Sequence, residues 1–594
     1  MKMLDRISAR QIWRLLIVVA ICWGCWLRFY KLDAKVYWED EVFTSLRLSG
    51  YSHQELVEQT FHGDIVYPAD LLQFQIAHED KSIGDVIHGL TEDTHPPAYF
   101  VLLRLWSNWF GYSTTSVRAL SATVSLLLLP SVFGIAWLLF ERSPQRQAIA
   151  ELATALVAVS PYQISLANEA RMYSLLPVAT TLAGLCLLWA IRRQRQGLNR
   201  GDRLGKPLSK RAYRHAWGWY GLLSASSLYV HWLAVPILVG YGFYVWLQQQ
   251  AVRSLHWSLH WARAQKRYLL MSAFTVGAIL PWVAFMGRGL SNVYYQTKWT
   301  GEAVTFWGAE ESLGQLWLQH GLMLFFNGDI LAQLPILKWM GGGLAIAFVG
   351  WALIYLVRHT ALPVWSFLLI SSGIIYAPLA VSDIFLGGRR SGIFRYFSPS
   401  IGAIEITVAF ALVSLGGVAF YKTHSDKTHS DKTQSGQRRS DKASDNENKG
   451  GLRMAARSAI AFLLISGALS QTVAKVTYSV DQQPLGDVAS VVNSTPNAIL
   501  VSDAPRPSLL LPLAHLLKDE TPLMLTVRPN LPTLREVRDR PVFLYLTSEA
   551  FQTSLEAQGN YLRPVADVDN LFSVEPAQIA AIEPAQSDST KPGP

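Results

Sequence analysis

Runs of about 20 apolar residues recur along the chain, separated by polar connections. Because roughly 20 residues of α-helix cross the hydrocarbon core of a bilayer, each run predicts one membrane-spanning helix. About eleven spans are expected, at residues 11–29, 117–140, 148–167, 173–191, 216–232, 234–250, 268–287, 335–357, 361–381, 397–420 and 455–476. The pattern therefore predicts an α-helical polytopic membrane protein.

The connections between these spans differ in charge. Basic residues gather in alternate connections, at residues 142–146, 192–214, 253–267, 358 and 422–457, and also precede the first span. Since Lys and Arg stay on the cytoplasmic side, the N-terminus is expected to be cytoplasmic. The acidic loop 30–97, the loop 288–334 and the C-terminal region are then exterior. The expected location is the inner (plasma) membrane of the cell.

The segment from Pro97 to Phe110 is apolar but has only about fourteen residues, too few to span a bilayer untilted. If it crossed, every later loop would change sides and the basic connections would become exterior. We therefore expect a helix that lies at the outer interface.

Composition supports a membrane protein. Of 594 residues, 50% are hydrophobic and only 16% are charged, which excludes a disordered or ordinary cytosolic chain. The net charge of +9 is sorted by loop and does not cover one soluble face, so no nucleic-acid partner is expected. Cys22, Cys25 and Cys186 all lie in apolar runs and predict neither a disulfide framework nor a metal cluster.

Three polar regions complete the predicted organisation around a membrane domain at residues 1–480. Residues 421–454, with two copies of Thr-His-Ser-Asp-Lys, predict a disordered cytoplasmic linker. Residues 481–575 alternate short β-rich runs with helix-like stretches near 507–518 and 548–558, which predicts a small exterior α/β domain. The β-rich runs are 498–502, 523–527, 542–546 and 571–574. The tail 576–594 is expected to be disordered.

The first candidate site is Tyr37-Trp38-Glu39-Asp40-Glu41, close after the first span. Three adjacent carboxylates near a membrane interface resist ionising together, and such a group suits a general base that accepts a proton from a hydroxyl. The plainer interpretation is the solvated start of an acidic loop.

A second set lies at the expected exterior ends of later spans. His95 and Tyr99 flank two prolines that set the start of a short helix. Glu169, Arg171 and Tyr173 stand between two apolar runs, where ionisable groups are usually paired or functional, and a structural salt bridge is the alternative. His231 ends another span and is more often a packing residue than a catalyst.

Exterior arginines oppose the positive-inside trend and therefore need a reason. Arg389 and Arg390 lie in Gly387-Gly388-Arg389-Arg390-Ser391-Gly392, and Arg395-Tyr396 follows. Arginine forks bind phosphate, and glycines let the backbone approach it closely, so a phosphate or diphosphate group is the expected ligand. Anchoring at lipid headgroups is the alternative.

These motifs occur in a familiar order. Together with Arg118-Ala119-Leu120-Ser121 and Ser160-Pro161, they resemble the GT-C membrane glycosyltransferases, specifically bacterial family 39. That branch is related to protein O-mannosyltransferases and lipid A aminoarabinose transferases. The likeness covers roughly residues 10–420 and rests on the order of the motifs, none of which is decisive alone.

The resemblance implies transfer of a sugar from a polyprenyl-phosphate donor to a lipid, glycan or protein acceptor on the periplasmic face, with inversion. The family's catalytic aspartate maps onto Asp40, Glu41 completes its Asp-Glu pair, and the second acidic position maps onto Glu169. Donor phosphate would meet Arg171, Arg389, Arg390 and Arg395, and substrate would meet His95, Tyr99, Tyr173, His231 and Tyr396. No cofactor is certain, although Asp40 and Glu169 could hold a divalent cation.

Three other functions compete with this interpretation. A multi-span transporter or flippase of a lipid-linked or anionic substrate would favour internal repeats and charges near span centres, and neither is evident. A lipid-linked polymer ligase would concentrate its polarity in one large later loop. A structural scaffold would leave the acidic triplet and the exterior arginines without a joint purpose.

Overall fold

The computed structural model divides into two compact units, one of residues 1–35 and 79–478 and the other of residues 36–78 and 479–594. It describes the chain except residues 1–8, 91–94, 201–209, 252–254, 288–297, 302–304, 306–311, 418–437, 479–483, 506, 533, 535–538, 567 and 577–594. Most of the expected linker and the whole of the tail beyond Pro576 therefore lie outside the described residues.

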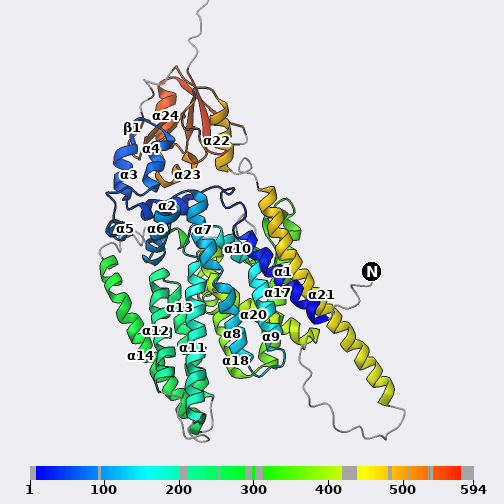
Figure 1. Ribbon diagram of the computed structural model, residues 1–594. Helices are drawn as coiled ribbons and strands as arrows, with labels where there is room; N and C mark the ends of the chain where they lie inside the picture. The colour runs from blue at the N-terminus through cyan, green and yellow to red at the C-terminus, as the bar shows by residue number, and fades with distance from the viewer. Residues whose placement is uncertain are drawn as a thin grey trace, which may run out of the picture. The chain divides into compact units, whose positions relative to one another are not determined.

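The first unit is helical, and seven of its described helices are long and apolar enough to cross a membrane (Figure 1). Two bent pairs, α9 with α10 and α18 with α19, bring this number to nine if each pair is one span. The other two expected spans lie on α12 and α13, which are helical, but α13 has only 17 residues and α12 opens on basic residues. The prediction of a multi-pass helical membrane protein is confirmed.

The helices of this unit follow the expected spans closely. The long ones are α1 (Ala9–Leu27), α7 (Thr114–Ser125), α8 (Leu128–Leu139), α9 (Arg146–Val159), α10 (Pro161–Ala167), α11 (Leu175–Arg200), α12 (Lys210–Val230), α13 (Ala234–Gln250), α14 (Leu255–Met286), α17 (Pro335–His359), α18 (Leu362–Gly373), α19 (Tyr376–Leu386), α20 (Ser398–Gly416) and α21 (Arg438–Thr477). The remaining ones are α5 (Ile83–Gly89), α6 (Ala98–Phe110), η5 (Lys298–Gly301), α16 (Leu313–Met323), η6 (Gly328–Leu331), η7 (Arg390–Gly392) and η8 (Phe394–Phe397).

The break between α9 and α10 is built around Arg28. The helices meet at Ser160-Pro161 with a bend of 54°. A proline cannot donate the next helical hydrogen bond, so carbonyl groups before it need other partners. The fully buried Arg28 guanidinium donates to the carbonyls of Val157 and Ala158, at 3.1 and 2.6 Å. Arg28 thus supplies the hydrogen bonds that these carbonyls lack at the break, and the bend sets the direction of α10, which leads to residues 168–173.

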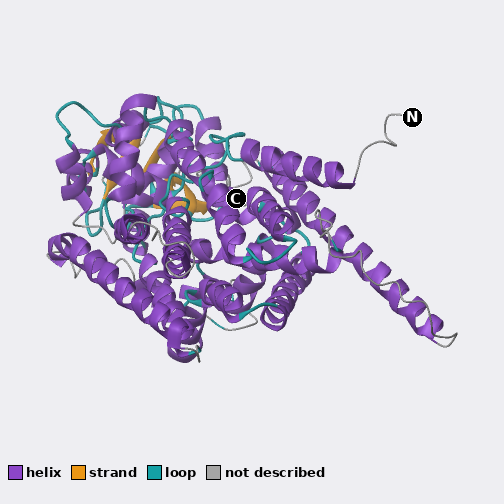
Figure 2. Cartoon of the chain, turned by 60° about the horizontal axis from the view of Figure 1, so that its bottom comes forward, coloured by secondary structure: helices purple, strands orange, loops and turns teal. Residues whose placement is uncertain are grey.

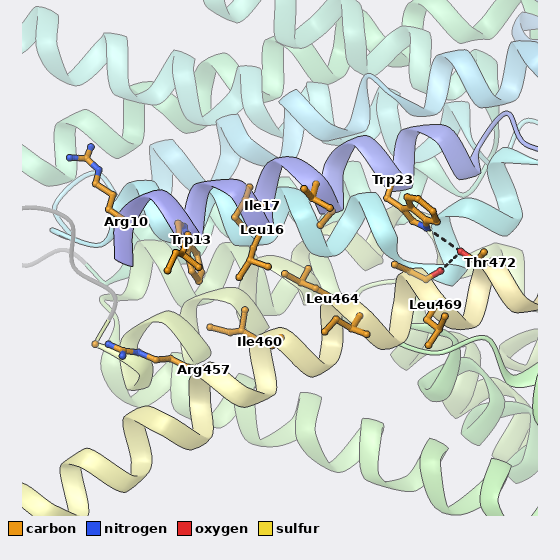
Figure 3. A pocket seen from close by; sticks show the side chains of 17 residues that line it. Arg10, Trp13, Leu16, Ile17, Trp23, Arg457, Ile460, Leu464, Leu469 and Thr472 are labelled. Carbon is orange, nitrogen blue, oxygen red and sulfur yellow. Dashed lines mark hydrogen bonds between the residues drawn. The ribbon is translucent and has the colours of Figure 1, made fainter. Parts of the chain in front are cut away.

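An apolar groove of about 810 Å³ runs between α1 and α21 (Figure 3). Arg10 and Arg457 lie at one end, and Trp23 donates to the Thr472 hydroxyl at 3.1 Å toward the other. The side chains between them are aliphatic apart from Trp13, as expected where two spans face hydrocarbon. The groove therefore carries no group for chemistry.

The second unit contains a six-stranded sheet with strand order β1-β3-β2-β4-β6-β5, drawn in orange in Figure 2. Strands β3, β2 and β4 are parallel, and the outer pairings are antiparallel. The strands are β1 (His62–Val66), β2 (Ile499–Ser502), β3 (Leu523–Thr526), β4 (Val542–Tyr545), β5 (Asn560–Pro564) and β6 (Leu571–Pro576). The helices are α2 (Glu39–Ser49), α3 (His53–Thr60), α4 (Pro68–Leu72), η2 (Gln73–Gln75), α22 (Pro484–Ser494), η10 (Pro507–Leu509), α23 (Leu511–Ala514) and α24 (Glu549–Ala557).

The four predicted strands of this unit correspond to β2, β3, β4 and β6, and the stretch 548–558 forms α24. Residues 36–78, expected within the membrane domain, belong instead to the second unit, because β1 pairs with β3. The expected linker is also shorter than predicted, because α21 begins at Arg438. Extending an existing helix needs no new nucleus, which explains how a polar sequence becomes helical there.

Candidate active site

Tyr173 is the centre of a cluster in the first unit that unites most of the expected site residues. Its buried ring has the guanidinium carbon of Arg395 at 5.5 Å and that of Arg171 at 5.9 Å from its centroid. An aromatic face attracts cations, and this cation–π attraction is strongest when the cation is shielded from water. Two guanidinium groups on one ring create a local excess of positive charge suited to an anion.

His231, in the turn between α12 and α13, packs against the same ring at 5.3 Å between centroids. The ring centroids of His95 and His231 lie 5.4 Å apart, and those of Tyr396 and Tyr173 lie 6.5 Å apart. The His231 side chain is buried.

The tautomer of His231 follows from its backbone contact. The Leu233 backbone N–H donates to Nδ1 at 3.0 Å, so Nδ1 is an acceptor. In a neutral ring the proton is then on Nε2, which is available as a donor.

Arg171 is held in place from α7. The Tyr99 hydroxyl pairs with the Ser121 hydroxyl at 2.7 Å, and Ser121 donates to the Arg171 carbonyl at 3.3 Å. Tyr99 is fully buried and contacts Arg171 through Ser121, so its role in this structure is to support the Arg171 backbone.

Arg395 lies on η8, which is fixed by two rings on other elements. The Tyr162 hydroxyl donates to the Phe394 carbonyl, and the two rings lie 3.8 Å apart. His320, on α16, packs against Phe394 and Phe397 at 5.8 and 5.6 Å. Burial lowers the pKa of His320 to about 4, although its hydrogen bond to the Gly392 backbone acts in the opposite direction. No sequence signal marked His320, because it is a single histidine in the segment 288–334, for which the sequence predicted only a loop.

Glu169 forms an ion pair with Lys35, whose ammonium lies 3.0 Å from a carboxylate oxygen. Arg118 donates to the carbonyls of Leu32 and Lys35, at 2.6 and 2.9 Å, and so orders the residues before the acidic triplet. If Glu169 has only the structural role of a salt bridge, Lys35 is the partner in that salt bridge. Lys35 was visible in the sequence only as one of few cations in an acidic loop.

Arg389 and Arg390 form part of a turn. The Arg390 guanidinium contacts the buried Asp383 carboxylate at 3.1 Å, and the Ser391 backbone N–H donates to that carboxylate at 2.5 Å. The Arg389 guanidinium carbon lies 6.0 Å from the Trp299 centroid. Gly388 has a φ of +118°, and a Cβ there would meet the Thr300 carbonyl at 2.8 Å. The glycines thus serve this turn, and a role for Arg389 and Arg390 in phosphate binding stays a prediction.

The acidic triplet lies in the second unit, where it forms the first turn of α2 rather than a loop. Acidic side chains are common in the first turn of a helix, because the positive end of the helix dipole attracts negative charge. Glu39 accepts a hydrogen bond from the Ser508 hydroxyl at 2.8 Å, and Glu41 is fully buried. Asp40 is half-buried.

Within the described part of the chain, no group of three or more His, Cys, Asp or Glu side chains is arranged to hold a metal ion. The divalent cation that Asp40 and Glu169 could bind stays a prediction.

No protein-family model and no curated protein matches the chain in sequence. Among solved structures, the chain is similar to ArnT from Cupriavidus metallidurans in the apo state, with 15% identity and a TM-score of 0.49. That likeness covers 96% of this chain and 98% of the other, and the same enzyme bound to undecaprenyl phosphate gives 14% and 0.48.

A second similar structure is the oligosaccharyltransferase AglB from Archaeoglobus fulgidus, in complex with an inhibitory peptide and a dolichol-phosphate. Its identity is 13% and its TM-score 0.46, over 85% of this chain and 64% of the other. Both are GT-C membrane glycosyltransferases, the group that the sequence motifs resemble. At such identities and TM-scores, function has to be argued from the residues themselves.

Proposed function

We propose that the chain is a membrane glycosyltransferase that moves a sugar from a polyprenyl-phosphate donor to an acceptor hydroxyl. The observation that supports this proposal is the pair of guanidinium groups, Arg171 and Arg395, that both lie within 6 Å of the centroid of the buried Tyr173 ring. An anion that reaches this cluster meets two charged forks at once, and phosphate is the anion whose geometry those forks match.

The rest of the cluster suits a sugar attached to that phosphate. Tyr173 and Tyr396 offer aromatic faces against which a sugar ring packs, and His231, whose Nδ1 is an acceptor, offers an Nε2–H donor. His95 packs edge-on against His231 and adds another polar ring to the cluster. The solved structures above include complexes with undecaprenyl phosphate and with a dolichol-phosphate, which belong to the carrier class proposed here.

Asp40 is the proposed general base. Of the three carboxylates in the first turn of α2, Glu39 is bonded to Ser508 and Glu41 is buried, which leaves Asp40 the most suitable to receive a proton. Lys35 precedes Asp40 by five residues in the sequence and is paired with Glu169 within the first unit. Glu169 then acts through Lys35 as a positioning residue.

The reaction is a single displacement. The acceptor oxygen attacks the anomeric carbon while Asp40 takes its proton, and the bond from that carbon to the phosphate oxygen breaks. The departing polyprenyl phosphate takes the electron pair, and Arg171 and Arg395 neutralise its charge. One displacement inverts the configuration at the anomeric carbon.

The face of the membrane follows from the charge pattern. With the basic connections cytoplasmic, the Asp40 segment and the Arg395 turn are both exterior, so donor and acceptor meet on the periplasmic face of the inner membrane. The acceptor is a lipid, glycan or protein on that face.

The test uses the full chain in lipid with a panel of radiolabelled polyprenyl-phosphate sugars, and follows loss of sugar from the carrier. Asp40→Asn should reduce consumption by about 10²- to 10⁴-fold while donor binding persists, because only the proton acceptor is lost. Asp33→Asn, an exposed change in the same acidic loop, serves as the matched control.

Normal turnover by Asp40→Asn would remove Asp40 as the base. Binding of donors by the wild type without consumption, even when crude envelope acceptors are supplied, would favour a transporter over a transferase.

A further inference from the structure

A cavity of about 620 Å³ lies within the first unit, away from the Tyr173 cluster. It is enclosed by the ends of α8, α11 and α13, the start of α14, the α17–α18 connection and the last turns of α20. These helix ends carry the basic connections on which the topology was based. The cavity therefore faces the side of the membrane that the positive-inside rule makes cytoplasmic.

The mouth of the cavity is strongly basic. Arg142, Arg192 and Arg195 line it, and Glu141 is the one carboxylate among the described residues that do so. Glu141 pairs with Arg192 at 3.1 Å, and each side chain is about one-third exposed. The described lining thus carries three guanidinium groups and one carboxylate, and phosphate is the anion that guanidinium forks favour.

The inner wall is apolar and aromatic. Leu188, Ile191, Tyr244 and Phe410 line it, and the polar Gln248 beside them is already bonded to the Ser366 hydroxyl at 2.8 Å. A soluble anion at the mouth would leave this wall in contact with water, which costs free energy in proportion to its apolar area. A ligand with a phosphate and a hydrocarbon chain satisfies both regions.

We propose that this cavity binds an anionic phospholipid of the cytoplasmic leaflet, with its phosphate at Arg142 and Arg195 and an acyl chain along Tyr244 and Phe410. Basic pockets between membrane helices on the cytoplasmic side recognise lipid headgroups by this combination. The site is separate from the proposed transferase reaction and does not depend on it.

The experiment measures the thermal unfolding midpoint of the full chain in phosphatidylcholine nanodiscs that contain increasing fractions of phosphatidylglycerol. A ligand that binds only the folded state raises this midpoint in a saturable way. The double variant Arg142→Gln/Arg195→Gln keeps the Arg192–Glu141 pair and should need about tenfold more phosphatidylglycerol for half of the effect. Arg263→Gln removes an exposed charge on α14 that does not line the cavity, and should leave the titration almost unchanged.

An equal weakening in Arg263→Gln and in the double variant would overturn the proposal, because it would indicate attraction to the charged surface alone. Equal stabilisation by inorganic phosphate in pure phosphatidylcholine nanodiscs would also overturn it, since the ligand would then be a soluble anion. Native mass spectrometry gives the independent readout. Phosphatidylglycerol should remain bound to the wild type and to Arg263→Gln, and should be lost from the double variant.

Discussion

Tyr173 contacts two guanidinium groups, which carry like charges and would repel each other without a shared partner. Its ring attracts both Arg171 and Arg395, and the polar supports of these arginines come from different helices. The site is therefore organised before any anion arrives. Pre-organised charges of this kind stabilise a departing phosphate without reorganising during the reaction.

The forked shape of Arg395 should matter as well as its charge. Arg395→Ala is expected to raise the KM for the donor by about tenfold or more, and Arg395→Lys should recover only part of the loss, because lysine cannot bind phosphate with two parallel hydrogen bonds. Steady-state kinetics with a fixed acceptor concentration would measure this effect, with Arg358→Lys as a remote control. Equal KM values for all variants would remove Arg395 from the phosphate site.

His320 should make the fold sensitive to acid. Its pKa in the folded state is about 4, below the 6.5 of an unperturbed histidine, so between these values the unfolded chain binds a proton that the folded chain does not. Stability should therefore fall as the pH decreases from 6.5 to 4, by roughly 3 kcal/mol for this one group. Thermal unfolding midpoints across this range would measure the fall, and His320→Gln should flatten it. A slope that His320→Gln leaves unchanged would contradict this assignment.

Most of the Tyr173 cluster could be found from sequence, since the hypothesis named Arg171, Tyr173, His231 and Arg395 from charges near the ends of apolar runs. Such charges are costly near lipid, so they stand out in composition. His320 could not be found, because its role depends on contacts with Phe394 and Phe397 on a distant segment.

At the scale of elements, the ion pair between Lys35 and Glu169 joins the segment before α2 to the segment after α10. Lys35 is 48% exposed, so the pair itself contributes little to stability, on the order of 0.5 kcal/mol. Its importance should lie in positioning the chain that leads to Asp40.

A double-mutant cycle tests that role. Lys35→Met and Glu169→Gln should each lower kcat several-fold with little change in donor KM, and the double variant should be no worse than either single one, because both remove the same contact. Strictly multiplicative losses would contradict the coupling. A loss caused by Glu169→Gln that Lys35→Met does not reproduce would point instead to direct catalysis by Glu169.

The spans and the strands β2, β3, β4 and β6 were predictable because bilayer thickness and strand alternation impose lengths and periods on the sequence. The helices α2, α3 and α5 were not predicted within the acidic loop. The Ser-based capping boxes of α3 and α5, at Ser52 and Ser82, are local signals that the charge pattern obscured.

At the scale of the molecule, the second unit is assembled from two distant parts of the chain. Ile65 on β1 stands opposite Met524 on β3. Partners opposite each other in an antiparallel pair have Cα atoms about 4.5–5.5 Å apart, close enough for a disulfide. Nothing in the periodicity of either segment identifies its partner, which is why residues 36–78 were assigned to the wrong side of the boundary between the units.

Cysteine cross-linking checks this pairing. In a background without the native cysteines, Ile65→Cys/Met524→Cys should form a disulfide under mild oxidation, detected by an altered mobility on non-reducing gels. Val66→Cys/Met524→Cys is the matched control, because Val66 stands opposite Leu523 and adjacent residues of a regular strand point to opposite faces. Equal cross-linking of both pairs would contradict the register.

The split origin of this sheet also determines when it can form during synthesis. Strand β1 leaves the ribosome more than 450 residues before β3, whose pairing begins at Leu523. At translation rates of roughly 5–20 residues per second, β1 would wait roughly 20–90 s for its neighbour. A chain interrupted anywhere in that interval would be inserted in the membrane yet carry an unpaired strand, a feature that proteolytic quality control can recognise. The β1–β3 pairing can therefore form only in chains whose synthesis has passed β3.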